Sequence, residues 1–255
     1  MYVNTTGIVL RETAYKDSSK ILTVLAGGEG KLTVTARGAI RRNSKFAAAT
    51  QLLAFSEMTL YSSRDRWTLT EARSVEQFIG LRDDISLLAL GAYFAELTEA
   101  VADEDSPSPE LLPLILNALY ALSEKIKTPE FVKPAFELRL MAVSGFAPLI
   151  EHCSMCGARD IEKAFVDISG GTICCIDCMQ DGGAALSRGA LGAARYIACC
   201  DAKKLFSYTL SDAALKELAS AAEGYLLTHL ERRFRTLDFY KEIAMVDSLT
   251  HGKDA

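Results

Sequence analysis

The chain has 255 residues, of which 49% are hydrophobic and 24% are charged, as in an ordinary globular protein. It contains neither low-complexity tracts nor internal repeats, and no apolar run approaches the ~20 residues of a membrane span. The N-terminus lacks the charged and apolar regions of a secretory signal. Seven cysteines then indicate reduced thiols or a metal site rather than disulfides. We therefore expect a cytoplasmic protein with no membrane association.

The formal net charge of −5 is unevenly distributed along the chain. Residues 1–80 carry 11 Lys and Arg against 7 Asp and Glu, a net of +4, whereas the remainder carries a net of −9. Residues 83–124 contain nine acidic residues and no basic residue. This asymmetry favours a basic working face on one module and an acidic second module that is either partner-facing or solubilising.

The pattern of residues 1–80 predicts a small β-barrel. Five short segments have strand character, with a glycine-rich turn before the third and one long interruption after it. This count and rhythm are typical of an OB-type barrel, although an SH3-like barrel or a short sandwich fits nearly as well. The predicted strands are Thr6–Leu10, Ile21–Ala26, Leu32–Ala36, Leu52–Tyr61 and Trp67–Arg73.

The most basic stretch runs from Gly30 to Ala49 and is followed by no acidic residue before Glu57. Its first part alternates as a half-buried strand does, and its second part contains breakers, which predicts a loop leaving the sheet. Such a loop is either a solvated connection or a site for a polyanion. Three of its five cations are Arg, the better phosphate ligand, and nucleic acid commonly lies beside strands 2 and 3 of OB barrels. The predicted DNA-binding residues are Lys31, Arg37, Arg41, Arg42 and Lys45. Phe46 and Trp67 are either base-stacking residues or barrel core.

From about Phe78 onward the hydrophobic period becomes helical, which predicts a helix bundle with three apolar stripes before residue 145. Ser108-Pro109 and Thr128-Pro129 have the pattern of helix starts. A further helix is predicted from Ser211 to about Arg235, with His229 packed on its apolar face. Arg232, Arg233 and Arg235 form a second cationic cluster, explained either by the helix dipole or by nucleic acid.

The most specific motif is a pair of Cys-x-x-Cys knuckles, Cys153 with Cys156 and Cys175 with Cys178. This spacing is typical of a four-thiolate zinc site, in which two knuckles complete a tetrahedron. Two short strands predicted at 164–168 and 172–174 form a hairpin that brings the knuckles together. Four protein ligands leave no open position, so we expect one structural Zn²⁺. Cys174 is an alternative to Cys175, although its spacing to Cys178 fits less well.

No motif for phosphate-loop binding, serine hydrolysis, zinc-protease chemistry or dinucleotide binding is present, and the three histidines lie far apart. The expected protein is therefore not an enzyme. A zinc-dependent nucleic-acid hydrolase lacks a nucleophile and an open metal site.

Several segments together resemble the RecO family of bacterial recombination mediators. They are Thr6–Arg11, Gly30–Leu32, Ala36–Arg42, Phe136–Leu140, Gly145–Pro148 and the two knuckles with Gly170-Gly171 between them. The resemblance implies an α+β fold, in which an N-terminal five-stranded OB-type barrel precedes a helical domain carrying an inserted zinc-ribbon-like module. The expected domains are 1–80 (barrel), 81–150 (helical, first part), 151–182 (zinc module) and 183–255 (helical, second part).

The resemblance also implies what the protein does. A family member binds single- and double-stranded DNA, anneals complementary single strands and helps to deliver a RecA-type recombinase onto strands coated by single-strand-binding protein, together with a RecR-type partner. The implied location is the cytoplasm, in association with the nucleoid. The alternative from a different class is a zinc-stabilised adaptor that scaffolds repair or replication proteins through its acidic helices, with little DNA binding of its own.

Overall fold

The computed structural model describes residues 1–64, 66–104, 106–179 and 183–251, with side chains in the last helix described to Val246. Contacts between residues divide the chain into two compact units. One unit is Met1–Glu124 together with Phe234–Ala255, and the other is Lys125–Arg233. The four-part domain organisation expected from the sequence stays a prediction. No helix in the described part of the chain is long and apolar enough to cross a bilayer.

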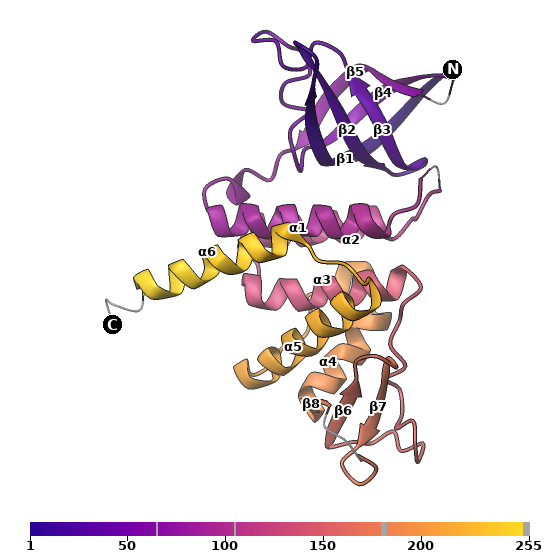
Figure 1. The fold of residues 1–255 in the computed structure, drawn as a ribbon, viewed down its shortest axis with the longest axis vertical. Coiled ribbons are helices and arrows are strands. Elements are labelled where there is room, and N and C mark those ends of the chain that lie inside the picture. The colour runs from indigo at the N-terminus through magenta and orange to yellow at the C-terminus, as the bar shows by residue number, and fades with distance from the viewer. Residues whose placement is uncertain (65, 105, 180–182, 252–255) are drawn as a thin grey trace. The chain divides into compact units, whose positions relative to one another are not determined.

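The first unit begins with a closed five-stranded barrel, in which the strands follow the order β1-β2-β3-β5-β4 and β4 pairs back to β1 (Figure 1). All neighbouring strands are antiparallel except β3 and β5. This confirms the OB-type prediction over the SH3-like and sandwich alternatives. The strands are β1 (Tyr2–Tyr15), β2 (Ser19–Ala26), β3 (Gly30–Ala36), β4 (Phe55–Ser63) and β5 (Arg66–Glu76).

Strand β1 is much longer than the five residues expected. Its first half pairs with β4 and its second half with β2, and the register shifts between Val9 and Arg11. A bulge of this kind bends a strand, which lets one strand serve two neighbours in a closed barrel. The barrel interior is filled by alternating apolar residues, among them Val9, Leu22, Val24, Leu32, Val34 and Leu60.

Helices complete the first unit, and α1 packs against both α2 and α6. Helix α1 begins after Asp84, whose carboxylate accepts hydrogen bonds from the backbone N–H groups of Ser86 and Leu87. Helix α2 begins at Leu111, two residues beyond the predicted start at Pro109, because residues 109–110 form a turn instead. The elements are η1 (Ile79–Leu81), α1 (Ile85–Val101), α2 (Leu111–Ser123) and α6 (Arg235–His251).

The second unit contains three helices and a three-stranded antiparallel sheet in the order β7-β6-β8. Helix α3 starts after Thr128 with Pro129 in its first turn, as predicted, and the β6–β7 hairpin is also confirmed. The elements are α3 (Pro129–Val143), β6 (Lys163–Asp167), β7 (Thr172–Cys175), β8 (Ala184–Ser187), α4 (Arg188–Cys199), η2 (Ala202–Lys204) and α5 (Asp212–His229).

The single helix predicted from Ser211 to Arg235 is wrong, because the helix ends before Arg235 and a different helix begins there. Helix α5 ends at His229, and Glu231 has a positive φ of 48°, which an α-helix does not accommodate. The next helix begins only at Arg235. The apolar stripe used for the prediction covers α5 alone.

Candidate nucleic-acid interface and candidate metal centre

The segment between β3 and β4, residues 37–54, is a series of turns anchored to the barrel. Gly38 has a φ of +71°, which favours glycine, and its carbonyl accepts a hydrogen bond from the Arg41 N–H at 3.2 Å. The Ile40 N–H donates to the Ser18 carbonyl at 3.1 Å, which ties the segment to the β1–β2 turn. Ala39 is buried against the barrel core. The segment is therefore a fixed platform.

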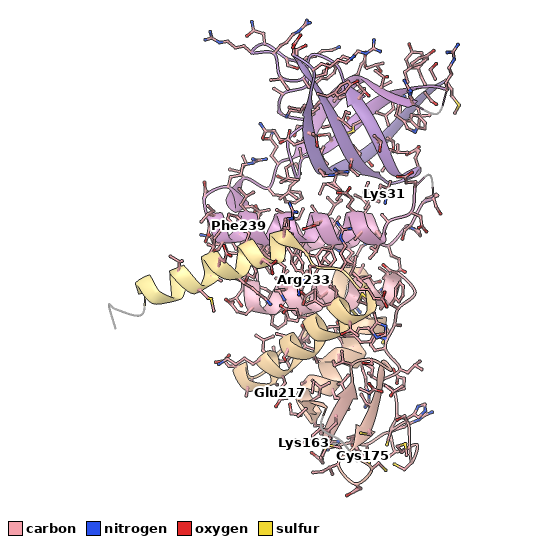
Figure 2. The ribbon with its side chains drawn as sticks, in the orientation of Figure 1. Lys31, Lys163, Cys175, Glu217, Arg233 and Phe239 are labelled. Atoms are coloured by element: carbon pink, nitrogen blue, oxygen red, sulfur yellow. The ribbon has the colours of Figure 1, made fainter. Side chains whose placement is uncertain are left out.

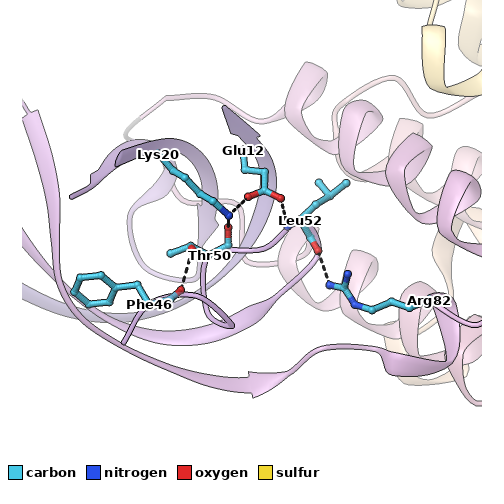
Figure 3. Close-up of polar contacts among 6 residues, drawn as sticks. All are labelled: Glu12, Lys20, Phe46, Thr50, Leu52 and Arg82. Carbon is cyan, nitrogen blue, oxygen red and sulfur yellow. Dashed lines mark hydrogen bonds and ion pairs between the residues drawn. The ribbon is translucent and has the colours of Figure 1, made fainter. Parts of the chain in front are cut away.

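Polar contacts fix the end of this segment (Figure 3). The Lys20 ammonium forms an ion pair with Glu12 and donates to the Thr50 carbonyl at 3.2 Å. The other oxygen of Glu12 accepts the Leu52 N–H at 3.3 Å. The Thr50 hydroxyl in turn donates to the Phe46 carbonyl at 2.8 Å. The charge of Lys20 is thus neutralised by Glu12. The cations Arg37, Arg41, Arg42 and Lys45 of the segment take no part in these contacts.

Four of the five predicted DNA-binding residues lie on this platform, and all four are exposed: Arg37, Arg41, Arg42 and Lys45. In the part of the chain that the structure describes, none of them forms an ion pair with a carboxylate. Lys45 lies over the ring of Phe46, with its ammonium 5.1 Å from the ring centre. The structure thus presents four unneutralised cations from one short segment.

Lys31 is not brought together with these four residues. It lies near the start of β3, whereas Arg37 follows the end of the same strand, roughly 20 Å away at ~3.3 Å per residue. Its ammonium donates to the Glu99 carbonyl of α1 at 3.1 Å, and its backbone N–H donates to the Asp103 carbonyl. Figure 2 shows Lys31 at the end of the barrel next to α1. The ammonium of Lys31 therefore lies at the C-terminal end of α1, where the helix dipole favours a positive charge.

Three cations that the sequence did not single out lie beside the platform. Lys16 comes from the β1–β2 turn, and Arg64 and Arg66 come from the β4–β5 hairpin. Lys16 and Arg66 line a groove together with Arg37 and Arg41, and Arg64 and Arg66 line an adjoining groove with Arg37. Their location in predicted turns could have identified them, because turns at the same end of a barrel lie close together once the barrel closes.

The other cations of residues 1–80 are neutralised. Each forms an ion pair with a carboxylate, and the pairs are Arg11 with Glu99, Lys20 with Glu12, and Arg73 with Glu57. Apart from Lys31, seven cations without a described carboxylate partner therefore remain, contributed by the β1–β2 turn, the platform and the β4–β5 hairpin. Asp65, between Arg64 and Arg66, lies outside the described residues. A positive patch of this kind attracts a polyanion.

Of the two aromatic residues with alternative interpretations, Phe46 belongs to the barrel core and Trp67 packs against it. Phe46 is 8% exposed and lies within the cluster of buried residues, and the partly buried Trp67 packs against that cluster. The ring of Phe46 is therefore not presented for stacking on bases, and that of Trp67 is only partly exposed.

In the second unit the four knuckle cysteines converge. The sulfur atoms of Cys153, Cys156, Cys175 and Cys178 all lie within 4.8 Å of one another. The sulfurs of Cys156 and Cys175 are 3.8 Å apart, the separation of about 3.8 Å that a tetrahedral site with Zn–S bonds of ~2.3 Å requires. Figure 2 places Cys175 near the tip of the second unit. The cluster has the donors and spacing to hold a metal ion.

Cys175 rather than Cys174 points into the cluster. Adjacent residues of β7 face opposite sides of the sheet, and the Cys174 thiol lies 3.8 Å from the Phe165 carbonyl, away from the other sulfurs. Burial raises the pKa of the Cys174 thiol. The geometry therefore favours Cys175 between the alternatives that the sequence left open.

Backbone N–H groups of the knuckles favour the thiolate of Cys153. Hydrogen bonds from Cys156, Cys175 and Met155 outweigh its burial and lower its pKa to about 6. The bond from the Cys175 N–H to the Cys153 sulfur measures 3.4 Å. Gly157, with a φ of +76°, closes the first knuckle. A thiolate held in this way is the form that binds metal.

His229 lies outside the cysteine cluster. Its ring packs on Tyr225 with ring centres 4.1 Å apart, and its Nε2 is 3.0 Å from the Ile168 carbonyl. It is the packed histidine that the sequence predicted. Arg232 and Arg233 lie in the connection after α5, and Arg235 starts α6, so they do not share one helix turn.

Comparison with known proteins matches both parts of the chain. The family model "Recombination protein O N terminal" matches residues 1–78, and the model "Recombination protein O C terminal" matches residues 82–238. A protein named "DNA repair protein RecO" from Acetivibrio thermocellus is 32% identical over 244 residues, 95% of this chain and 97% of its own length. The protein of the same name from Symbiobacterium thermophilum is 34% identical and covers 92% of this chain and 95% of its own length.

Proposed function

The chain belongs to the Recombination protein O (RecO) family of DNA repair proteins, and we propose that it acts as a non-catalytic mediator of repair and recombination. In this proposal it binds single- and double-stranded DNA and anneals complementary single strands. With a RecR-type partner, it helps to load a RecA-type recombinase onto strands coated by single-strand-binding protein. It works in the cytoplasm, in association with the nucleoid.

The observation that supports this proposal is that the seven cations of the platform, the β1–β2 turn and the β4–β5 hairpin lie at one end of the barrel. We call this its cationic end. Two complementary strands are both polyanions, and they approach each other only when their phosphates are neutralised. Arg37, Arg41, Arg42 and Lys45 neutralise phosphates in this proposal, together with the hairpin-turn cations Lys16, Arg64 and Arg66. Lys31 is left out of the proposed surface because its ammonium is bound to the Glu99 carbonyl.

The cysteine cluster is proposed to hold one structural Zn²⁺. When bound, the ion links the segment before β6 to the end of β7 and the segment after it, and the binding free energy contributes to folding. The four sulfurs fill a tetrahedron, which leaves no position for a substrate or an activated water. The proposal therefore gives the metal no catalytic role.

A salt titration of single-stranded DNA binding tests the proposal, comparing the wild type with Arg41→Glu/Arg42→Glu. Each phosphate contact contributes about −0.7 to the slope of log affinity against log salt, so seven contacts set a limit near −5. Loss of two contacts makes the slope shallower by about 1.4, and the reversed charges weaken binding further. Circular dichroism establishes that the variant is folded.

Arg11→Glu/Arg73→Glu is the matched control, because it changes the net charge equally but replaces cations already paired with carboxylates. We expect this variant to keep the wild-type slope. If both variants lose the same affinity for DNA, net charge alone explains the loss, and the cationic end is not the DNA-binding site.

The adaptor alternative is supported by exposed acidic residues outside the barrel. Several acidic residues of the 83–124 stretch have structural roles, since Asp84 caps α1 and Glu99 pairs with Arg11. Asp103 and Glu104 are exposed, so Asp103→Asn/Glu104→Gln tests the alternative. If this variant loses repair activity in cells while Arg41→Glu/Arg42→Glu retains it, the adaptor is the better description.

A further inference from the structure

Two adjoining grooves run across the cationic end of the barrel. One has a volume of ≈ 570 Å³ and is lined by Arg37, Tyr61, Arg64 and Arg66. The other has a volume of ≈ 490 Å³ and is lined by Tyr15, Lys16, Arg37, Arg41 and Arg66. Arg37 and Arg66 line both grooves, so the two share part of their walls, and together they are called the groove below. Among the described residues, no carboxylate lines either one.

Each of the two adjoining grooves has one exposed tyrosine in its lining. Tyr61 on β4 is 38% exposed, and Tyr15 at the end of β1 is 41% exposed. The ring of Tyr61 lies beside that of its cross-strand neighbour Tyr2, with ring centres 5.0 Å apart. Neither hydroxyl has a hydrogen-bond partner in the described part of the chain. An exposed ring beside unpaired cations is the combination with which proteins bind single-stranded nucleic acid.

The strand register places the cations between the two rings. Tyr61 pairs with Thr68 of β5, and Thr68 pairs with Thr35 of β3, which is two residues before Arg37. Tyr15 pairs with Ser19 at the start of β2, the next strand along. The path from Tyr61 to Tyr15 therefore crosses four steps between neighbouring strands and is offset by two residues along them, because Thr35 pairs with Ile21 and Ile21 pairs with Thr13. Small hydroxyl side chains line the floor between the rings.

We propose that this groove binds an unpaired stretch of DNA, with bases stacked on Tyr61 and Tyr15 and with phosphates on the cations between them. Stacking on a ring needs a free base face, which a strand within a duplex does not offer. The tyrosines therefore make the cationic end prefer single strands, whereas the cations alone bind both forms. This proposal rests on the proposed DNA-binding function and names the feature of DNA that the same site selects.

The test compares oligodeoxythymidylate with an abasic strand of the same length, which keeps the phosphates and removes the bases. Loss of stacking costs ~1 kcal/mol or more for each base, about a five-fold change in affinity for each tyrosine. The wild type is expected to bind the abasic strand at least ten-fold more weakly. Tyr15→Ala/Tyr61→Ala is expected to bind both strands with similar, weakened affinity and to keep the wild-type salt slope.

Two variants control for the loss of the rings. Tyr15→Phe/Tyr61→Phe keeps both rings and is expected to restore the discrimination between the two strands. Tyr120→Ala removes a tyrosine of α2 that is 52% exposed and lies outside the groove, and it is expected to behave as wild type.

The possible outcomes separate the two proposals. If the wild type binds neither strand, the DNA-binding function itself fails. If the wild type binds both strands equally, or if the alanine variant discriminates as well as the wild type, the stacking proposal is overturned while the function stands.

Discussion

At the scale of single residues, Lys133 shows how a buried charge is maintained. It lies in α3 and is 8% exposed, and its ammonium is 2.7 Å from Glu137 and 2.8 Å from Glu223. Burial disfavours the charged form, but the two carboxylates outweigh this effect and raise the pKa of Lys133. Glu137 is fully buried. The buried charge of Glu137 is thus tolerated only while the ammonium of Lys133 neutralises it.

We predict that Lys133→Met lowers the free energy of unfolding by about 3–5 kcal/mol, because it leaves the Glu137 charge buried without its cation. Urea unfolding followed by circular dichroism measures the change. Lys133→Met/Glu137→Leu removes both charges and is expected to recover most of the loss. Similar losses in the single and double variants would show that packing, not charge, is responsible.

The pH dependence of this pair follows from the raised pKa. A group with a raised folded-state pKa stabilises the protein fully below its unfolded pKa, and this contribution is lost as pH rises through the folded value. For a lysine the unfolded pKa is ~10.4. The contribution of Lys133 is therefore constant between neutral pH and about pH 10 and declines only above that range.

Gly30 is a second residue whose identity is dictated by its surroundings. Its φ is +78°, and a Cβ at this position would collide with the backbone of Ser106. We predict that Gly30→Ala destabilises the protein by roughly 1–3 kcal/mol, measured by the same urea unfolding. Gly28→Ala is the control, because a Cβ there has no neighbour within 4 Å and its φ is not in the left-handed region. A neutral Gly30→Ala would contradict the close approach of the two segments.

At the scale of elements, the cysteine-bearing hairpin makes a sharp prediction. Cys175→Ser should lose the bound metal and lower the melting temperature, whereas Cys174→Ser on the same strand should retain one metal ion per chain. Elemental analysis of the purified variants measures the metal and identifies it. Metal retained by Cys175→Ser and lost by Cys174→Ser would reverse the ligand assignment.

Elements were predictable where a local pattern was sufficient. Thr128-Pro129 starts α3 because a cap followed by Pro in the first turn is a local signal. Local patterns failed where tertiary contacts decided. Strand β1 extends from Tyr2 to Tyr15 because β4 and β2 pair with its two halves, and its two ends contain too few apolar residues to mark it as a strand in the sequence. Strand β8 has only four residues and is formed by pairing with β6.

At the scale of the whole molecule, the net charge of −5 conceals a basic surface. The closed barrel concentrates unpaired cations at one end, while the remaining cations of residues 1–80 are used in ion pairs or at the end of α1. Net charge therefore gives no measure of affinity for a polyanion. Affinity for a polyanion depends instead on which cations lack a carboxylate partner, and the fold determines which ones these are.

The sequence alone determined the barrel, the helical character after Phe78 and the family, because periodicity, turn residues and the order of motifs are local. It also determined the four-cysteine cluster, since two knuckles at this spacing converge on one point. Only the tertiary structure decided which cations meet. In the closed barrel, Lys31 contacts α1, whereas Lys16, Arg64 and Arg66 lie beside Arg37. Tyr15 and Tyr61 line the two adjoining grooves there. These residues are far apart in sequence, and only strand pairing across the barrel sets their distances.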